Sequence, residues 1–464
     1  MKKTKSIFLT MDNLRYYSDI LRGETIQELA KLYSVVVLSP DVDEATAKKR
    51  NYFIHPNVIY APYIAKNKNT IDLFNTLRYA LIRTYDSFAA TKDWYYNRQT
   101  LPFVKRTLTR IGTIFPSWFP TPGFFTALEI FFITPTEQFQ SLVKKYSPSL
   151  MVTMTPGFVP FEAELVLSAK KMSLPTAAIY MSFDNPFNQG KFLRKTNYIT
   201  AWSADMKQDT EKFLGYPDHA IFVTGCVRFD HYIQNERENA LRSRNDFLLS
   251  KNLDPNKKTI MHATSTPRAF PWRKEFIDEF MRLKKNGELI GDPNILIRIH
   301  PVDILEPYKE YLGMPGVCIE KAGKEIISDS KAPTKKIKTE MDGEDRKNLT
   351  ETMKYSDVVV NCFSTTTLEA SIFNTPIVSI VFPKGAEVAL EYETPKEFIK
   401  SGGITVASNA EELKHAINAY IKNPSLHQKG REILVDRFLQ FTDGMSWRRT
   451  ADAIKKIVEK PSGN

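Results

Sequence analysis

Three short polar stretches directly follow apolar runs in the second half of the chain, and their residue types suit them to anion binding. Thr264 and Ser265 follow "TIMHA", and Arg298 and His300 occur in "NILIRIHP". The third stretch, which follows "DVVV", contributes Asn361, Ser364, Thr365, Thr366 and Glu369. Hydroxyl groups and the unpaired N–H groups at the start of a helix form a site suited to phosphate. Together the three stretches predict a phosphate-binding site.

Each stretch also has an ordinary structural interpretation. Ser364 or Thr365 would then serve only as the N-cap of the following helix, with Glu369 in its first turns. A His-Pro pair alone is a weak signal, because His55 also precedes a proline and has no hydroxyl-rich partner stretch. His300, which follows a strand, can donate a hydrogen bond to a phosphate whether its ring is protonated or neutral. The combination of the three stretches favours binding over capping.

Short apolar runs that alternate with helical patterns predict the elements that position these residues. This alternation is typical of α/β proteins with parallel sheets. In the first half we expect strands at residues 5–10, 33–40, 149–154, 175–181, 198–203 and 220–225. In the second half we expect them at 258–264, 294–300, 357–362, 376–382 and 403–408. Ligands of such sheets bind beyond the carboxyl ends of the strands, which is where the polar stretches lie.

The two series of strands predict two Rossmann-like domains that face each other. We expect an acceptor-side domain at 1–230, a polar linker at 231–257, a nucleotide-donor domain at 258–435 and a helix at 436–464 that crosses back to the first domain.

Two insertions interrupt this pattern. Residues 100–140 are rich in Phe, Trp and Pro, which favours packing on the first domain over contact with a membrane, since prolines interrupt an amphipathic helix. Residues 319–340 carry six lysines and four acids without a period, which predicts a loop.

Composition limits the class of protein and its partners. With 464 residues, 42% of them hydrophobic and 25% charged, the chain is typical of a soluble globular protein of two domains. Its formal charge of +11 favours anionic partners such as nucleotides or phospholipid headgroups. No nucleic-acid-binding module is recognised, and we expect no nucleic acid partner. Cys226, Cys318 and Cys362 have no C-x-x-C spacing, which argues against a cysteine zinc site and fits a reducing compartment.

The N-terminal stretch "MKKTKSIFLTMDN" reaches Asp12 after too few apolar residues for a signal peptide. No uninterrupted apolar segment of about 18 residues predicts a transmembrane helix. We therefore expect a cytoplasmic protein, with association at the inner face of an anionic membrane as a further hypothesis.

Several stretches resemble the GT-B superfamily of nucleotide-sugar glycosyltransferases, above all bacterial surface-polysaccharide transferases and CDP-glycerol glycerophosphotransferases. The resemblance is carried by "FVTGCVRFDHY", "TIMHATSTPR", "RIHP", "YSDVVVNCFSTTTLEASIFNTPIVSIVF" and "FTDGMSWRRTADAI". GT-B sialyltransferases hold the nucleotide phosphates with an HP element and a Ser/Thr element, which His300-Pro301 and Ser364-Thr365 match in order. The acidic motif of that family has no clear match here.

The resemblance implies an inverting, metal-independent glycosyltransferase that needs no cofactor and acts on a glycan or lipid-linked acceptor. A base from the first domain would take the acceptor proton, and Asp184 in "SFDNP" and Asp12 in "TMDNL" are the candidates. Both also fit ordinary turn chemistry. The alternatives are a CDP-alditol phosphotransferase, a sugar-nucleotide epimerase and a non-catalytic GT-B-like protein.

Overall fold

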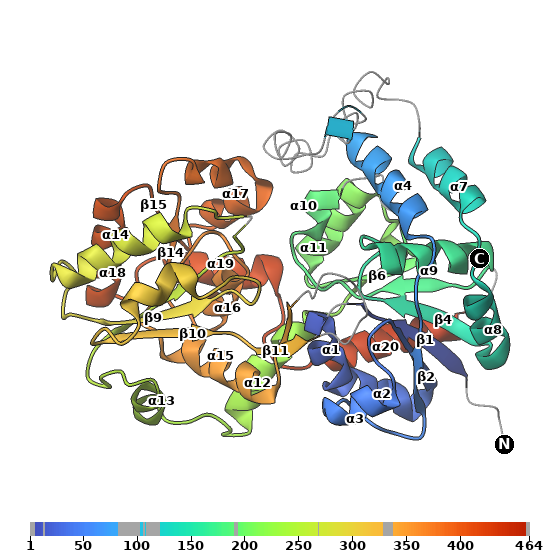
Figure 1. The fold of residues 1–464 in the computed structure, drawn as a ribbon, viewed down its shortest axis with the longest axis horizontal. Coiled ribbons are helices and arrows are strands. Elements are labelled where there is room, and N and C mark those ends of the chain that lie inside the picture. Colours follow the sequence, from blue (N-terminus) through green and yellow to red (C-terminus); the bar gives the residue numbers. More distant parts are fainter. Residues whose placement is uncertain are drawn as a thin grey trace. The chain divides into compact units, whose positions relative to one another are not determined.

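The computed structural model describes residues 5–12, 14–81, 103–104, 107, 121–189, 194–267, 269–327 and 337–460. The chain divides into two compact units. Unit 1 comprises the residues up to Arg228 together with those from Met445 onward, and unit 2 comprises Phe229–Gly444. Each unit is built on a parallel sheet with helices on both faces (Figure 1).

The sheet of unit 1 has seven parallel strands in the order β3-β2-β1-β4-β5-β6-β7. They are β1 (Ser6–Thr10), β2 (Ser34–Ser39), β3 (Val58–Pro62), β4 (Pro148–Thr153), β5 (Thr176–Ala178), β6 (Tyr198–Ala201) and β7 (Ile221–Val223). Ile7, Phe8 and Leu9 of the central strand are fully buried. A strand buried on both faces must be continuously apolar, which explains why the sequence predicts it.

Helices cover both faces of this sheet. They are α1 (Leu14–Leu21), α2 (Glu24–Leu32), α3 (Glu44–Lys49), α4 (Lys68–Leu81), α7 (Pro122–Phe132), α8 (Glu137–Tyr146), α9 (Pro160–Lys171), α10 (Asn185–Gln189), α11 (Ala204–Asp209) and α20 (Ser446–Glu459). Several of these helices begin at residues that favour a helix N-terminus. Thr121 and Thr136 cap α7 and α8 with their side chains, and Pro160 occupies the first turn of α9.

The sheet of unit 2 has six parallel strands in the order β10-β9-β8-β13-β14-β15. They are β8 (Thr259–Ala263), β9 (Asn294–Ile299), β10 (Val317–Lys321), β13 (Val358–Asn361), β14 (Ile377–Ile380) and β15 (Thr405–Ala407), and β11 (Lys324–Ile327) pairs antiparallel with β12 (Ile337–Glu340). The helices are α12 (Asp230–Arg237), α13 (Arg244–Ser250), α14 (Arg273–Lys285), α15 (Gly343–Tyr355), α16 (Thr366–Ile372), α17 (Glu393–Lys400), α18 (Ala410–Lys422) and α19 (Gln428–Phe438).

Two stretches differ from the sequence prediction. Residues 231–257, predicted as a polar linker, contain α12 and α13, which pack on α15 within unit 2. Their charges are partly neutralised there, since the Arg242 guanidinium donates to the buried Glu351 carboxylate at 3.1 Å. Residues 319–340, predicted as a loop, contain part of β10 and the β11–β12 pair.

The C-terminal helix α20 belongs to unit 1, where it packs on α2. The predicted crossing is therefore present, although it starts later than residue 436, because α19 packs on α16 in unit 2. Of the aromatic-rich insertion at 100–140, residues 100–102, 105–106 and 108–120 lie outside the described residues.

Candidate functional site

The carboxyl ends of three adjacent strands of unit 2, β9, β8 and β13, bring the predicted polar stretches to one edge of the sheet. Thr264 joins the first two. Its backbone N–H donates to the Arg298 carbonyl at 3.1 Å, and its hydroxyl oxygen accepts the backbone N–H of His300 at 2.8 Å. Thr264 is buried and acts by positioning His300. The neighbouring Ser265 is half-buried, and its hydroxyl makes no hydrogen bond to the described residues.

The imidazole of His300 is held in one tautomer. The backbone N–H of Val302 donates to its Nδ1 at 3.2 Å. A backbone N–H can only donate, so Nδ1 is unprotonated and the neutral ring carries its proton on Nε2. His300 is half-buried and lies at the carboxyl edge of the sheet.

The turn between β13 and α16 presents hydroxyl groups at the same edge. Phe363 has a φ of +45°, a left-handed conformation that turns the chain sharply between strand and helix. Ser364 and Thr366 are hydrogen-bonded to each other through their hydroxyls, and they and Thr365 are half-buried. Thr365 occupies the N-cap position, but its side chain makes no cap hydrogen bond. The capping interpretation is thus correct for the positions of Thr365 and of Glu369 in the first turn, but not for a side-chain cap bond.

Two predicted binding residues instead hold the turn from inside. The amide of the fully buried Asn361 donates to the hydroxyls of Thr366 and Thr367, each at 3.1 Å. The buried Glu369 carboxylate accepts the Tyr232 hydroxyl of α12 at 2.7 Å. The structure thus gives Asn361 and Glu369 positions that support the turn.

Arg298 lies on β9, but its guanidinium is paired with Glu320 of β10. Glu320 also pairs with Lys251 and accepts the Asn348 amide at 3.1 Å. These cations lower the pKa of the Glu320 carboxyl despite the opposing effect of its burial. Because Arg298 shares this carboxylate with Lys251, its charge is only partly offset, and its guanidinium is held toward β10.

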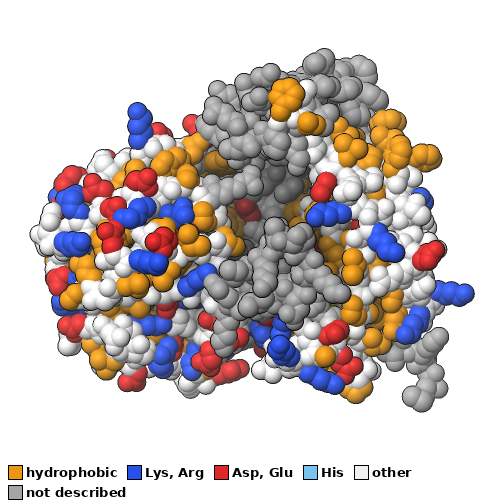
Figure 2. Space-filling view, viewed as in Figure 1, with side chains coloured by type: hydrophobic (Ala, Val, Ile, Leu, Met, Phe, Trp, Pro, Cys, Tyr) orange, Lys and Arg blue, Asp and Glu red, His pale blue; other side chains and the backbone are white. Residues whose placement is uncertain are grey.

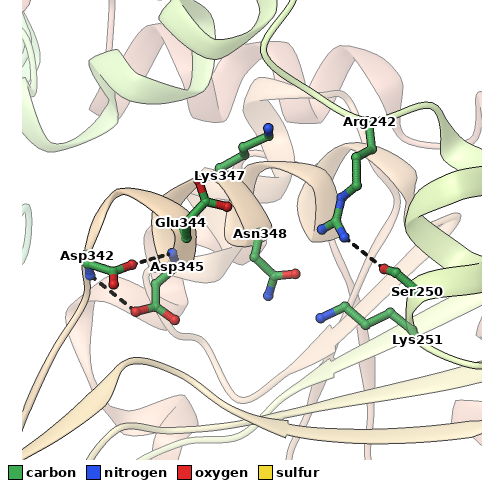
Figure 3. Close-up of a pocket in the computed structure, with 8 residues that line it drawn as sticks. All are labelled: Arg242, Ser250, Lys251, Asp342, Glu344, Asp345, Lys347 and Asn348. Carbon is green, nitrogen blue, oxygen red and sulfur yellow. Dashed lines mark hydrogen bonds between the residues drawn. The ribbon is translucent and has the colours of Figure 1, made fainter.

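A cavity of about 380 Å³ opens beside this ion cluster (Figure 3). Its lining mixes cationic, acidic and polar side chains, namely Arg242, Ser250, Lys251, Asp342, Glu344, Asp345, Lys347 and Asn348. Asp342 and Asp345 cap the start of α15 reciprocally, and burial raises the pKa of Asp345. None of the predicted site residues lines this cavity.

In unit 1, Asp12 follows β1 at the point where the strand order reverses between β1 and β4. Such a switch point is where doubly wound sheets bind ligands. Beside it, the fully buried Glu162 of α9 accepts the Met154 N–H at 2.7 Å and is hydrogen-bonded to the Thr155 hydroxyl. Burial and the charge of Asp12 raise the pKa of Glu162 to about 8.

Glu162 is not among the residues that the sequence predicts for the site. It stands in "PFEAELVL", whose pattern is that of a core helix. The two acids in this apolar run, Glu162 and Glu164, are the signal that could have drawn attention to it.

Asp184 lies beyond β5, on a turn. Its carboxylate is hydrogen-bonded to the Ser182 hydroxyl, and its carbonyl accepts the Phe187 N–H at 3.1 Å where α10 begins. The turn role that the sequence allows is therefore present, and the half-buried carboxylate stays on the carboxyl side of the sheet.

No protein-family model matches the chain, and no curated protein matches it closely. Solved structures match over almost its whole length. The S. aureus MnaA–UDP co-structure is 12% identical, with 99% of this chain and 100% of that chain covered and a TM-score of 0.54. A UDP-GlcNAc 2-epimerase from Neisseria meningitidis bound to UDP-GlcNAc is 11% identical, covers 97% and 100%, and has a TM-score of 0.53. The wall teichoic acid polymerase TagF is 11% identical, covers 98% and 90%, and has a TM-score of 0.52. The predicted fold, GT-B, is confirmed.

Proposed function

We propose that the protein transfers a sugar from a nucleotide-activated donor to an acceptor during synthesis of a bacterial surface polysaccharide or glycoconjugate. One observation carries the proposal. His300 and the hydroxyl-bearing residues Ser265, Ser364 and Thr365 each follow the carboxyl end of one of three adjacent strands of unit 2, β9, β8 and β13. Proteins of the same fold contain UDP or UDP-GlcNAc, ligands whose phosphates need such donors.

The reaction would be a single displacement. The acceptor oxygen forms a bond to the anomeric carbon as the bond from that carbon to the phosphate oxygen breaks. The N–H and O–H donors of unit 2 stabilise the charge that develops on the departing phosphate. We propose that these donors do so without a bound metal ion or another cofactor.

Unit 1 would supply the base that takes the acceptor proton. We favour Asp12, because it follows the central strand at the switch point of the sheet. Asp184 is the second candidate, since it also lies on the carboxyl side. A glycan or a lipid-linked glycan is the proposed acceptor.

A CDP-alditol phosphotransferase is the second candidate function. The TagF likeness spans 98% of this chain, and a further TagF structure contains CDPG. The same carboxyl edge of the unit 2 sheet would hold the pyrophosphate of CDP-glycerol or a similar substrate. The bond that breaks would then be a phosphorus–oxygen bond. An epimerase, the function of another protein of this fold, would instead convert the donor alone.

A thermal-shift series tests the proposal. The purified protein is heated with CMP, CDP, UDP, UDP-sugars, GDP-sugars or CDP-glycerol, with EDTA present. A ligand that binds the folded state raises Tm by mass action. We expect one nucleotide class to raise Tm, and His300→Ala to reduce the shift. If no donor in the series shifts Tm of the well-folded protein, the proposal fails.

Turnover then separates the candidate functions. The binding donor is incubated with and without a membrane glycolipid extract, and products are separated by chromatography. Nucleoside diphosphate or monophosphate that is released only with the extract supports sugar transfer. CMP released from CDP-glycerol supports the phosphotransferase, and a new sugar epimer formed without the extract supports the epimerase.

A further inference from the structure

Helix α7 carries an exposed apolar face. Its inner side packs on α9, and the buried ring of Phe125 meets Phe74 of α4 edge to face, with Ile133 buried beside them. Its outer side exposes Phe124, Leu128, Phe131 and Phe132, whose exposed fractions are 51%, 37%, 75% and 57%. Figure 2 shows hydrophobic side chains gathered over this region of unit 1. Four large apolar side chains on one helix face form a patch and are not scattered surface residues.

The outer face of α7 also lacks charge. The sole ionisable residue of the helix, Glu129, is fully buried beneath it. Its carboxylate accepts hydrogen bonds from the Nε atoms of Arg78 and Arg194, each at 3.1 Å. Two buried arginines thus turn the one acid inward, and the outward face is left entirely apolar.

Exposed lysines flank the C-terminal end of this helix. The side-chain amide of Asn67 donates to the Thr134 carbonyl at 3.3 Å, which places Lys66 and Lys68 beside the residues that follow α7. Glu137, at the start of α8, is an exposed acid nearby. Aromatic side chains next to lysines are typical of helices that lie in the interface of an anionic bilayer.

We infer that the outer face of α7 binds an anionic lipid surface, with the phenylalanines at the boundary of the acyl chains and Lys66 and Lys68 among the headgroups. Among the residues that the structure describes, no helix is long and apolar enough to cross a bilayer. The proposed contact is accordingly peripheral and reversible. It does not depend on which donor the protein uses.

The size of the face favours a membrane over a second copy of the chain. An 11-residue helix is about 16 Å long and about 10 Å wide, so its face offers on the order of 200 Å². A stable protein interface buries about 800 Å² on each partner. Interfacial insertion has no such threshold, because each buried apolar side chain adds to binding separately.

Vesicle flotation tests the inference. The full-length protein is mixed with vesicles of equal parts phosphatidylglycerol and phosphatidylcholine, or of phosphatidylcholine alone. We expect flotation with the anionic vesicles, weakened by salt. The double variant Phe124→Ser/Phe131→Ser is expected to bind about a hundredfold more weakly, since each phenylalanine contributes roughly tenfold. The matched control Leu249→Ser/Ile433→Ser, at exposed positions of unit 2, should bind like the unchanged protein.

A second readout does not require that the double variant folds. In Phe131→Trp, the emission of the new tryptophan should shift to shorter wavelength on addition of anionic vesicles, beyond any change in the unchanged protein. The inference is overturned if the unchanged protein does not float with anionic vesicles, or if the folded double variant floats equally well. It is also overturned if light scattering shows a dimer that the double variant abolishes, which would make a second copy the occupant of the face.

Discussion

The Nδ1 atoms of His55 and His300 make the same hydrogen bond, each accepting the backbone N–H two residues later, at 3.1 and 3.2 Å. In both places a proline follows the histidine. The dipeptide therefore sets the local turn and the tautomer. The two histidines differ in their position relative to a strand, because His55 precedes β3 whereas His300 follows β9. Only the second position lies at the carboxyl end of a strand, the side on which parallel sheets generally bind ligands.

This pair gives a matched test of the donor site. His300→Ala is expected to weaken nucleotide binding tenfold to about a hundredfold, the contribution of a hydrogen bond to a charged group. His55→Ala should leave the affinity unchanged, although it removes the same local bond. Isothermal titration with the nucleotide that raises Tm measures both. Equal losses in the two variants would show that the turn, and not its place on the sheet, determines the effect.

The two candidate bases can be separated by their effect on turnover. Asp12→Asn is expected to lower kcat about 100-fold or more, with little change in donor affinity. Asp184→Asn should lower kcat less, because Ser182 and the start of α10 already engage this residue. Steady-state rates with the accepted donor and acceptor provide the comparison. The opposite order of the two effects would assign the base to Asp184.

Glu162 should make the stability of unit 1 depend on pH. Its pKa rises from 4.5 to about 8 on folding, chiefly through burial. Well below pH 4.5 the carboxyl is protonated in both the folded and the unfolded state, so its ionisation does not change the free energy of unfolding. Between pH 4.5 and 8 the unfolded chain releases this proton while the folded chain keeps it, so the free energy of unfolding falls as pH rises.

Glu162→Gln should remove this dependence, since a neutral amide also accepts the Met154 N–H. Relative to the variant, the unchanged protein should lose roughly 2–4 kcal/mol between pH 5 and pH 8.5, as measured by denaturant unfolding. Glu137→Gln, at an exposed acid, serves as the control. Parallel pH curves for the unchanged protein and Glu162→Gln would contradict the assignment.

The buried ion cluster of Arg78, Glu129 and Arg194 should dominate the stability of the α4–α7 region. Glu129→Ala leaves two buried guanidinium groups without their carboxylate and is expected to cost about 3–5 kcal/mol. Glu44→Ala removes the partner of Lys48 from an exposed pair and should cost under about 1 kcal/mol. Urea unfolding measures both. A small loss in Glu129→Ala would indicate that water or another group replaces the carboxylate.

The sequence predicts the central strands because they are buried on both faces and hence continuously apolar. In the two large sheets it misses β3 and β10, which are sheet edges with half-exposed, mixed residues. Missing β10 also affects the prediction of the site. Because β10 is predicted as part of a loop, the pairing of Arg298 with Glu320 across the β9–β10 register cannot be foreseen.

The polar stretches at the carboxyl edge of the unit 2 sheet are predictable because each adjoins a recognisable strand. The sequence cannot show which of their members face inward. Asn361 and Glu369 carry the same chemistry as exposed ligands, and only the packing of Tyr232 and Thr367 reveals their supporting role. The sequence likewise cannot show that Asp12 and Glu162 lie close together, since about 150 residues separate them in the chain.

The return of α20 to unit 1 has a consequence for how the protein is made. Ile454, Ile457 and Val458 of this helix are buried, and Lys5 donates to the Val458 carbonyl at 3.2 Å. Unit 2 is one continuous stretch and can fold from its own residues, whereas unit 1 is completed only when α20 has been made and has packed on α2. Until then the partner surface on α2 stays open to chaperones and to proteolysis.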